Sequence, residues 1–565
     1  MTESATGSPR AAPVRGASPA TFDVAIVGGG HNGLVCAAYL AAAGLSVCVL
    51  ERRHVVGGAA VTEEFHPGFR NSTASYTVSL LDPQVIRDMN LAEHGLTISE
   101  RPFSNFLPLP GPDYLKVGGG LAATQQQVAR FSPRDAARLP AYYEMLDGVA
   151  EVLRAMLHRT PPNVRDGARH DVATLVDLLR TARPLRRLSL ARRRDVLDLF
   201  TKSAGDLLDH WFESDPIKAA FGFDAVVGNF QSPYTPGSAY VLLHHVFGEV
   251  NGKRGLWGHA RGGMGAITQA MANECAARGV VVRTGAPVAR VVVRNGRASG
   301  VALASGEVVP ARRVVANVNP KLLFAELVDA ADVDADFRAR IAAYRCGSGT
   351  FRMNVALAEL PDFVARPGVH AQPHHGSGIV IAPSLRYMEH AYFDARTAGW
   401  SAAPIVEVLI PSVVDDTLAP PGRHVASLFC QHVHPDIAAA RPGTTWDEHR
   451  DAVADLMIAT VDRVAPNFAR SVIGRRALTP LDLEREFGLV GGDIFHGALS
   501  LDQLFAARPV LGHADYRMPV RGLYLCGSGA HPGGGVSGIP GRNAAREVLR
   551  DARRRVPRKK SEASR

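Results

Sequence analysis

Near the start of the chain, residues 23–51 contain apolar runs in which apolar and polar positions do not alternate. Residues 24–27 (VAIV) form a short apolar run, which is typical of a strand buried on both faces of a parallel sheet. A glycine-rich turn, an apolar segment and a second apolar run at 45–50 follow. The pattern predicts strand, turn, helix and strand. Although residues 24–50 lack formal charge when His31 is neutral, their glycines interrupt the run, so we do not expect a membrane-spanning helix.

The glycines of this turn have the spacing of a dinucleotide-binding fingerprint. Gly28 permits the tight turn, Gly30 lets the backbone approach a pyrophosphate, and Gly33 lets the helix pack close to the strand. The N-terminus of the helix presents free N–H groups to phosphates. Glu51 ends the second strand about 20 residues further on, where an acid accepts hydrogen bonds from a ribose. We therefore predict a dinucleotide site; the alternative is a glycine-rich turn without a ligand.

Residues 122–208 are helical and charged in pattern. Ser132 is a plausible N-cap, and Pro133 suits the first helical position. Residues 180–194 carry seven arginines among three leucines. Such a basic amphipathic segment can lie on an anionic membrane surface, but a solvated helix face is the commoner explanation and is favoured here.

Residues 255–315 predict a glycine turn, a helix at 266–277, strands at 280–283 and 288–293, and a hairpin through Asn295 and Gly296. The glycines at 262, 263 and 265 do not have the fingerprint spacing, so we interpret 261–266 as a turn into the helix. No second complete dinucleotide fingerprint is visible, which argues against a second Rossmann domain that would bind NAD(P)H.

A second group of strands is predicted further along. These runs suit a mostly antiparallel sheet, and they are 351–357, 378–382, 404–410 and 424–430. Residues 447–464 form an amphipathic helix with Val453, Met457, Val461 and Val464 on one face.

The end of the chain returns to a glycine-rich pattern. Residues 523–526 form a buried strand, a glycine loop follows, and a helix begins near Gly538. Backbone N–H groups near Val536 could face electron-rich atoms of a ring or phosphate. The alternative, a glycine loop without a ligand, would be unusually elaborate, so cofactor contact is favoured.

Composition narrows the class of protein. The 565 residues, with 46% apolar and 21% charged residues, suit a globular protein of two or more domains. Six scattered cysteines with no close spacing argue against a zinc site, a redox dithiol and a disulfide scaffold, and favour a reducing compartment. The net charge of +9 is concentrated at the C-terminus, where residues 551–565 carry seven Lys/Arg against two acids. No nucleic-acid motif accompanies it, and we expect no nucleic-acid partner.

We therefore expect the following organisation. Residues 1–21, rich in Ser, Ala, Pro and Gly, form a disordered leader without a signal peptide, and residues 551–565 a basic disordered tail. A discontinuous cofactor domain comprises 22–85, 250–320 and 480–550. A substrate or helical domain comprises 86–249 and 321–479.

Four long motifs together resemble the carotenoid/retinoid oxidoreductase family, whose members are phytoene-desaturase-like flavoproteins distantly related to amine oxidases. The motifs are GGGHNGLVCAAYL, VLERRHVVGGAAVTEEFHPGF, TPLDLEREFGLVGGDIFHGALSLDQLFAARP and LYLCGSGAHPGGGVSGIPGRNAAR. Within the family they look most like the pyridine nucleotide-disulfide oxidoreductase domain-containing protein 2 group. They are also similar to bacterial β-carotene ketolases built on the desaturase fold.

The resemblance implies an α/β fold, with a Rossmann-type FAD-binding domain of the glutathione-reductase/amine-oxidase kind and a second, α+β substrate domain. It also implies FAD as the cofactor. The residues that match the family's cofactor contacts are Gly28, Gly30, Gly33, Glu51, Arg53, Gly57, Gly58, Val288, Gly527, Gly535 and Val536. One departure is Ala59, where many relatives have arginine after the glycine pair. The group's name suggests disulfide chemistry, which the lack of paired cysteines contradicts.

The expected function is that of an FAD-dependent oxidoreductase acting on a hydrophobic substrate, with desaturase- or dehydrogenase-type hydride transfer to the flavin N5. Alternatives are a carotenoid ketolase or isomerase, an amine-oxidase-like enzyme, or a flavoprotein that mainly binds a partner. No catalytic residue is assigned, although His496 and His531 lie in the matching motifs, and no metal is expected. The expected partners are a quinone or oxygen as electron acceptor, with peripheral membrane or protein contacts as further options. The expected location is the cytoplasm for a bacterial protein, or the mitochondrial matrix for a eukaryotic member of the group.

Overall fold

The computed structural model describes residues 21–163, 176, 179, 186, 188–246, 248–368 and 370–553. The expected leader and tail lie outside the described residues except for Thr21 and residues 551–553. Those last three residues continue a helix, so the helix extends further than the expected start of the tail. The basic segment predicted at 180–194 is described at 186 and from 188 onward.

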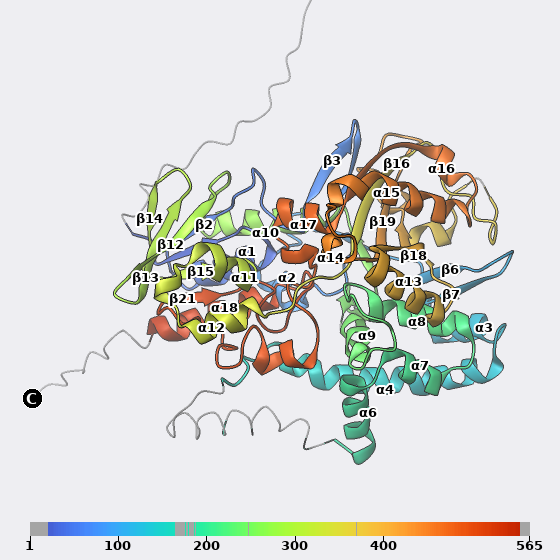
Figure 1. Ribbon diagram of the computed structural model, residues 1–565, viewed down its shortest axis with the longest axis horizontal. Helices are drawn as coiled ribbons and strands as arrows, with labels where there is room; N and C mark the ends of the chain where they lie inside the picture. The colour runs from blue at the N-terminus through green and yellow to red at the C-terminus, as the bar shows by residue number, and fades with distance from the viewer. Residues whose placement is uncertain are drawn as a thin grey trace, which may run out of the picture.

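A five-stranded parallel sheet forms the part of the molecule at the left of Figure 1. Four of its strands are buried at every residue, as expected for apolar runs inside a parallel sheet, and the edge strand Val281–Arg283 is half-buried. In spatial order they are β11 (Val281–Arg283), β2 (Val47–Leu50), β1 (Val24–Val27), β15 (Val314–Ala316) and β21 (Leu523–Leu525). All five lie within the segments predicted for the cofactor domain, so the fold brings the two ends of the chain together.

Three helices position this sheet. Helix α1 (His31–Ala42) follows the fingerprint turn and packs against α10 (Met264–Ala277) and α18 (Ile539–Arg553). A small antiparallel sheet, β12 (Val288–Arg294), β13 (Arg297–Leu303) and β14 (Val308–Pro310), lies beside β15. Asn295 and Gly296 both have positive φ, 52° and 68°, which confirms the predicted hairpin turn.

The second large sheet has seven strands and confirms the predicted, mostly antiparallel sheet; only β6 and β17 pair in parallel. In spatial order the strands are β20 (Val472–Leu478), β16 (Phe351–Leu357), β19 (His424–Val433), β18 (Trp400–Leu409), β17 (Gly378–Ile381), β6 (Asn105–Pro108) and β7 (Tyr114–Val117). Alternate residues of each strand face different cores. Phe429 packs with the helices on one face, and Leu428 and Cys430 pack with α15 (Trp446–Asp462) on the other.

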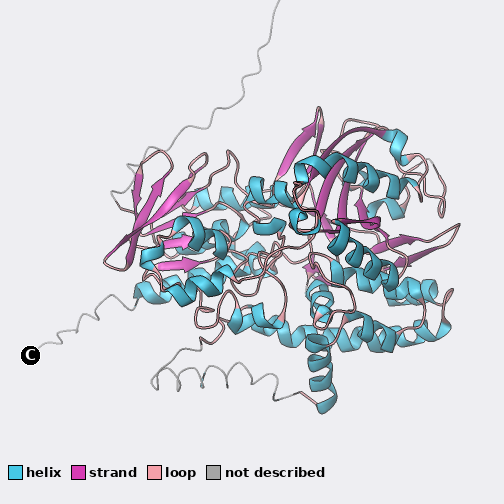
Figure 2. Ribbon diagram, in the orientation of Figure 1, coloured by secondary structure: helices cyan, strands magenta, loops and turns pink. Residues whose placement is uncertain are grey.

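Helices form a layer below this sheet in Figure 2. Ser132 caps the long helix α4 by accepting a hydrogen bond from the Asp135 N–H, and Pro133 is its first residue, as predicted. The helices of the layer are α3 (Leu121–Val128), α4 (Pro133–Leu157), α6 (Leu190–Thr201), α7 (Ala204–Trp211), α8 (Asp215–Val226) and α9 (Ser238–Val246).

Shorter elements connect these parts. The remaining helices are α2 (Pro83–Asp88), α11 (Pro320–Leu322), α12 (Ala335–Ala342), α13 (Leu385–Ala398), α14 (Ile437–Ala440), α16 (Phe468–Ser471) and α17 (Pro480–Phe487). The remaining strand pairs are β3 (Thr62–His66) with β4 (Phe69–Ser72), β5 (Ile98–Glu100) with β10 (Gly258–Ala260), and β8 (Glu249–Val250) with β9 (Lys253–Arg254). Among the described residues, none of the helices is both long enough and apolar enough to cross a membrane.

Candidate cofactor and active site

The fingerprint turn lies at the carboxyl end of β1. Gly28 has a φ of 96°, which an L-residue rarely adopts, and its N–H donates to the Leu50 carbonyl oxygen at 2.8 Å. Gly30 is the N-cap of α1 and makes no side-chain cap, so the first N–H groups of the helix face the space beyond the turn. This arrangement is the one that binds a pyrophosphate in dinucleotide folds.

A second glycine turn lies directly beside the first. The Gly57 N–H donates to the Gly29 carbonyl oxygen at 2.9 Å. A Cβ added to Gly30 would lie 2.9 Å from the Asn317 Nδ2 and 3.8 Å from the Gly58 Cα. The two turns therefore leave a bare backbone surface that a larger side chain would fill.

Glu51 closes one end of this surface. Its Oε2 accepts a hydrogen bond from the Gly29 N–H at 2.7 Å, and its Oε1 accepts one from the Arg53 N–H at 2.9 Å. Each carboxylate oxygen keeps a second lone pair, so the same side chain can also accept a ribose hydroxyl. The Arg53 guanidinium is held by Glu63 at 2.7 Å and lies over the Phe487 ring.

The predicted site residues fall into three groups. A cleft of about 280 Å³ is lined by Gly28, Gly30, Glu51, Arg53, Gly57, Gly58 and Val288. Gly535 and Val536 line a neighbouring cavity instead. Gly33 and Gly527 line neither cavity: they pack against Asn317, and a side chain on Gly33 would also collide with the Gly28 carbonyl oxygen.

Sequence reasoning missed Asn317. It lines the cleft, and its side chain donates to the Gly28 carbonyl oxygen at 3.2 Å. It directly follows β15, the neighbour of β1, and ligands of open parallel sheets bind at the carboxyl ends of strands. That position was the signal that could have identified it. Phe487, which stacks on Arg53, had no comparable signal because α17 is remote in sequence.

Several buried polar atoms that face the cleft have no hydrogen-bond partner among the described residues. They are His31 Nε2, Asn32 Oδ1, Arg53 Nη1 and His496 Nδ1, and all four side chains line the cleft. Buried polar atoms are rarely left unpaired in a folded protein, so these atoms fit a polar ligand such as a dinucleotide. Burial lowers the pKa of His31 to about 4 and that of His496 to about 3, which keeps both imidazoles neutral near pH 7.

A second cavity, here named the inner chamber, adjoins the cleft. Its volume is about 130 Å³, and it shares His31, Ala59, Leu489, His496 and Ser528 with the cleft. Its other walls carry the aromatic side chains Tyr76, Trp257, Phe429 and Phe495. No Lys, Arg, Asp or Glu of the described chain lines it.

Charged groups lie behind this apolar wall and are paired with one another. The Tyr76 hydroxyl donates to the Glu407 Oε2 at 2.5 Å, and Arg101 lies 3.9 Å from the other carboxylate oxygen. Burial raises the pKa of Tyr76 well above its ordinary value, so the phenol is protonated at neutral pH. Arg352 lies over the Tyr76 ring, 4.5 Å from its centre. The polar end of Tyr76 is thus held away from the chamber.

The two candidate histidines, His496 and His531, lie in different surroundings. His496 lines both cavities, whereas His531 lines neither. The His531 ring contacts Phe505, and its Nε2 lies 3.2 Å from the Met156 carbonyl oxygen, a structural hydrogen bond. Within the described residues, no group of three or more His, Cys, Asp or Glu side chains could hold a metal ion.

Comparison with known proteins places this geometry in a family. Residues 33–350 match the family model for flavin-containing amine oxidoreductases. The pyridine nucleotide-disulfide oxidoreductase domain-containing protein 2 of Rattus norvegicus is 43% identical over 546 residues, which cover 94% of each chain. A lycopene-forming phytoene desaturase of Paracoccus sp. (strain N81106) is 24% identical over 93% of this chain and 96% of its own.

Solved structures confirm the fold class. The cyclohexylamine oxidase from Brevibacterium oxydans has a TM-score of 0.54 and 17% identity, covering 94% of this chain and all of its own. The resemblance drawn from the four motifs is also confirmed, with the phytoene desaturases as more distant relatives. The chain belongs to the flavin-containing amine oxidoreductase family.

Proposed function

We propose that the protein binds FAD in the cleft and dehydrogenates a hydrophobic substrate in the inner chamber. The observation that carries this proposal is the junction of the two cavities. His31, Ala59, His496 and Ser528 line both, so a group that extends from the cleft enters the chamber beside the aromatic walls. When bound, the flavin supplies a two-electron acceptor for hydride transfer.

The protein's own residues have defined tasks in this proposal. Glu51 and the two glycine turns hold the dinucleotide end. The neutral imidazoles of His31 and His496 hydrogen-bond the cofactor where the cavities meet. The aromatic walls orient the substrate and exclude water. Because no Lys, Arg, Asp or Glu of the described chain lines the chamber, and the Tyr76 hydroxyl is directed to Glu407 behind the wall, the reaction does not depend on a strong protein base.

Two observations weigh against two of the alternatives, an amine oxidase and a protein that only binds a partner. The Tyr76 and Phe429 rings stack on each other with centres 5.0 Å apart, which leaves no gap between them for an amine. A cavity beside the cofactor cleft also supports an enzyme over a protein that only binds a partner. The similarity to a phytoene desaturase is consistent with oxidation of a hydrocarbon, and a quinone or oxygen is the proposed electron acceptor.

The test is anaerobic bleaching of the bound flavin. The protein is loaded with FAD and mixed separately with unsaturated and saturated hydrocarbons, alcohols and amines. Bleaching by a hydrocarbon, followed by recovery with a quinone or oxygen, is the expected result. Bleaching by amines alone would establish an amine oxidase, and a protein that takes up no FAD would overturn the proposal. As a control for the site, Val227→Trp fills the chamber at a residue that does not line the cleft, and it should keep FAD but lose bleaching.

A further inference from the structure

His496 has a backbone conformation that is unusual for a residue with a side chain. It lies in the turn at residues 493–497 (DIFHG), here named the histidine turn, and its φ is 57°. Residues other than glycine rarely adopt this left-handed conformation, because the Cβ approaches the backbone too closely. Residues held in such conformations cluster at ligand sites, where the surrounding structure keeps them in place. The contacts of the turn show what holds His496.

The Asp493 carboxylate fixes the peptide groups on both sides of His496. Its Oδ1 accepts a hydrogen bond from the Phe495 N–H at 2.8 Å, and its Oδ2 accepts one from the Gly497 N–H at 3.0 Å. The same Oδ2 accepts a third bond from the Gly347 N–H at 2.9 Å, which ties the turn to the segment before β16. The Asp493 side chain is buried, so little water competes for these donors. This one carboxylate therefore sets the conformation of the histidine turn.

The carbonyl groups of the turn are fixed as well. The Tyr344 hydroxyl donates to the His496 carbonyl oxygen at 3.0 Å. The guanidinium of Arg508, which is fully buried, donates to the Phe495 carbonyl oxygen at 2.7 Å. It also donates, at 2.8 Å, to the carbonyl oxygen of Ser528, a residue that lines both the cleft and the inner chamber. The turn is thus tied to the glycine loop that leads into α18.

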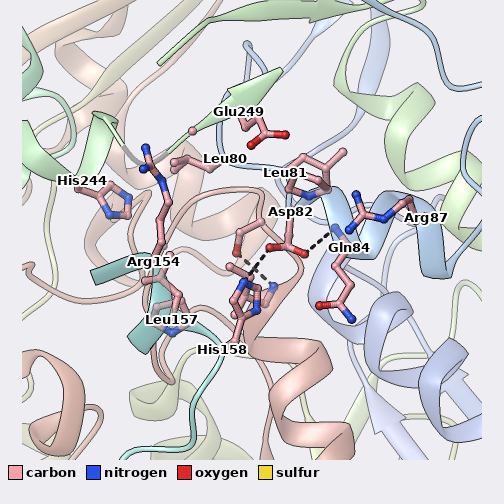
Figure 3. A pocket seen from close by; sticks show the side chains of 16 residues that line it. Leu80, Leu81, Asp82, Gln84, Arg87, Arg154, Leu157, His158, His244 and Glu249 are labelled. Carbon is pink, nitrogen blue, oxygen red and sulfur yellow. Dashed lines mark hydrogen bonds and ion pairs between the residues drawn. The ribbon is translucent and has the colours of Figure 1, made fainter. Parts of the chain in front are cut away.

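That glycine loop also packs against the turn. A Cβ added to Gly534 would lie 2.4 Å from the Phe495 Cα, so the contact requires glycine. On another side Gly534 lines a pocket of about 340 Å³, which Figure 3 shows. The walls of this pocket are tied together in turn, because Asp82 caps α2 and pairs with His158 at 3.2 Å. The histidine turn therefore cannot shift toward this pocket without displacing the loop.

The side chain of His496 differs from its backbone, because it has an atom that nothing in the described chain completes. The Nδ1 is buried without a hydrogen-bond partner among the described residues. The ring lines both cavities, at the place where they meet. A rigidly held turn thus presents an unsatisfied polar atom to the site proposed for the flavin. Buried polar atoms are rarely left unpaired, so this atom fits a ligand.

An imidazole in this position would change the electron affinity of a flavin. Most polar atoms at the edge of the oxidised ring system are hydrogen-bond acceptors, so a neutral imidazole meets them as a donor. Reduction adds electron density to those atoms, and a donated hydrogen bond becomes stronger as its acceptor gains negative charge. Hydrogen bonds to the ring are one of the means by which a protein tunes a cofactor. The bond therefore favours the reduced state over the oxidised state.

We propose that the His496 imidazole donates a hydrogen bond to the flavin ring and raises its reduction potential, and that Asp493 is the positioning residue that holds the imidazole there. This inference rests on the proposed function and deepens it by naming the residues that control the cofactor. His496 contacts the cofactor, whereas Asp493 acts only through the backbone of the histidine turn.

The first test compares two variants of His496 in the FAD-loaded protein. Glycine and asparagine both tolerate a φ of 57°. The asparagine amide places a donor on Cγ, as the Nδ1 of histidine does, whereas glycine offers none. A spectroelectrochemical titration measures the midpoint potential of the bound flavin without any substrate.

His496→Gly should lower the midpoint potential by about 30 mV or more, which corresponds to a tenfold change in the relative affinity for reduced and oxidised FAD. His496→Asn should recover at least half of this shift. The control is His531→Asn, at a histidine that lines neither cavity, and it should keep the wild-type potential. A His496→Gly potential that is unchanged or higher, or a His496→Asn potential equal to that of His496→Gly, would overturn the proposal.

The role of Asp493 is tested by a double-mutant cycle. Asp493→Asn replaces an acceptor of three N–H groups by an amide with one oxygen, so the turn loosens and the potential should fall as in His496→Gly. In the His496→Gly background, the same change should have no further effect, because the ring through which Asp493 acts is gone. Asp502→Asn, at an exposed acid paired with Arg345, is the control and should leave the potential unchanged. Additive shifts would refute the positioning role.

The outcome is independent of the substrate, because the titration requires no turnover. Unshifted potentials in variants that retain FAD would overturn this inference and leave the proposed dehydrogenation standing. A protein with the expected shifts whose flavin no hydrocarbon bleaches would refute the proposed function and leave the role of His496 standing.

Discussion

Some buried polar groups in the cofactor cleft lack hydrogen-bond partners among the described residues, whereas those at the sheet behind the inner chamber, Arg352 and Tyr76, have them. In the cleft, His31, Asn32 and Arg53 each keep a buried atom without a partner in the described chain. Behind the chamber, Arg352 is fully buried and donates to three acceptors, and Tyr76 is paired with Glu407. Unpaired groups cost free energy unless a ligand completes them. The difference indicates that a ligand completes the hydrogen bonds of the cleft, whereas the buried groups of Arg352 and Tyr76 already have partners within the chain.

The largest expected effect is the loss of the cleft through Gly33→Val. The added side chain collides with the Gly28 carbonyl oxygen and lies within 2.9 Å of Asn317 Nδ2, so the helix must move off the strand. We expect no bound FAD, measured from the absorption spectrum of the purified protein, and a loss of about 3 kcal/mol or more in the free energy of unfolding.

The control for this variant is Gly44→Asn, in the turn that follows the same helix. Gly44 has a φ of 83°, a Cβ added to it would meet nothing within 4 Å, and asparagine tolerates that conformation. It should retain FAD. If Gly33→Val also retained FAD, the close approach of α1 to the fingerprint turn would not matter for binding.

The second prediction concerns the second sheet, where the buried polar groups around Arg352 are paired. Arg352→Met removes donors to Ala74 O, Leu428 O and Ser427 Oγ, at 2.7–2.9 Å, and leaves those acceptors buried. We expect a loss of about 3–5 kcal/mol in the free energy of unfolding, measured with guanidinium chloride. The dissociation constant for FAD should change little. Arg423→Met, at an exposed arginine before β19, is the control and should change neither quantity. A large loss of FAD affinity in Arg352→Met would show that the two regions are coupled.

The third prediction returns to the cleft. Glu51→Gln replaces an acceptor of two backbone N–H groups with an amide that offers one oxygen. We expect FAD to bind about 10- to 100-fold more weakly, since hydrogen bonds to a charged group contribute about 1.5–3 kcal/mol. Titration of the apoprotein with FAD, followed by flavin fluorescence, measures the change. Glu307→Gln, an exposed partner of Arg283 at the edge of the same sheet, should bind FAD normally. Equal FAD affinity in both variants would show that Glu51 does not contribute to FAD binding.

The contrast between the regions also explains what could be predicted from the sequence. The βαβ unit at 24–50 was predictable because strand, glycine turn, helix and acid are contiguous and each needs its residue type locally. The strands of the second sheet were predictable as elements, since β16 coincides with the apolar run at 351–357. Their order was not, because pairing of β20 with β16 and of β6 with β17 depends on contacts far apart in sequence.

The residues of the candidate site are also of two kinds: some could be predicted from local sequence, and others come together only in the fold. Gly28, Gly30 and Glu51 carry local backbone requirements, and the structure places them in the cleft. Tyr76, Trp257 and Phe429 meet in the chamber only through tertiary packing, and an aromatic residue in a loop or strand has no local signature of that role. Asn317 could be predicted in part: its position after a strand of the parallel sheet is visible in the sequence, but its contact with the fingerprint turn is not.

The smallest expected effect tests the one described exception in the second sheet. His432, on β19, is fully buried, and neither ring nitrogen has a hydrogen-bond partner in the described chain, yet neither cavity beside the cofactor site reaches it. If unpaired buried atoms are useful only where a ligand completes them, the unpaired nitrogens of His432 lower the free energy of unfolding. His432→Phe should then raise it by about 1 kcal/mol at pH 7.

The same position should make stability depend on pH. Burial lowers the pKa of His432 to about 3 from 6.5, so below pH 6.5 the unfolded chain binds a proton that the folded chain does not. Stability contributed at this position is therefore lost as the pH falls from 6.5 toward 3, and the advantage of His432→Phe should grow by about 2 kcal/mol between pH 7 and pH 5. Guanidinium chloride unfolding at both pH values measures it, with His390→Phe at an exposed position of α13 as the control. An advantage that is the same at both pH values, or a loss of FAD affinity in His432→Phe, would mean that this histidine has a partner and that the second sheet is also built to be completed.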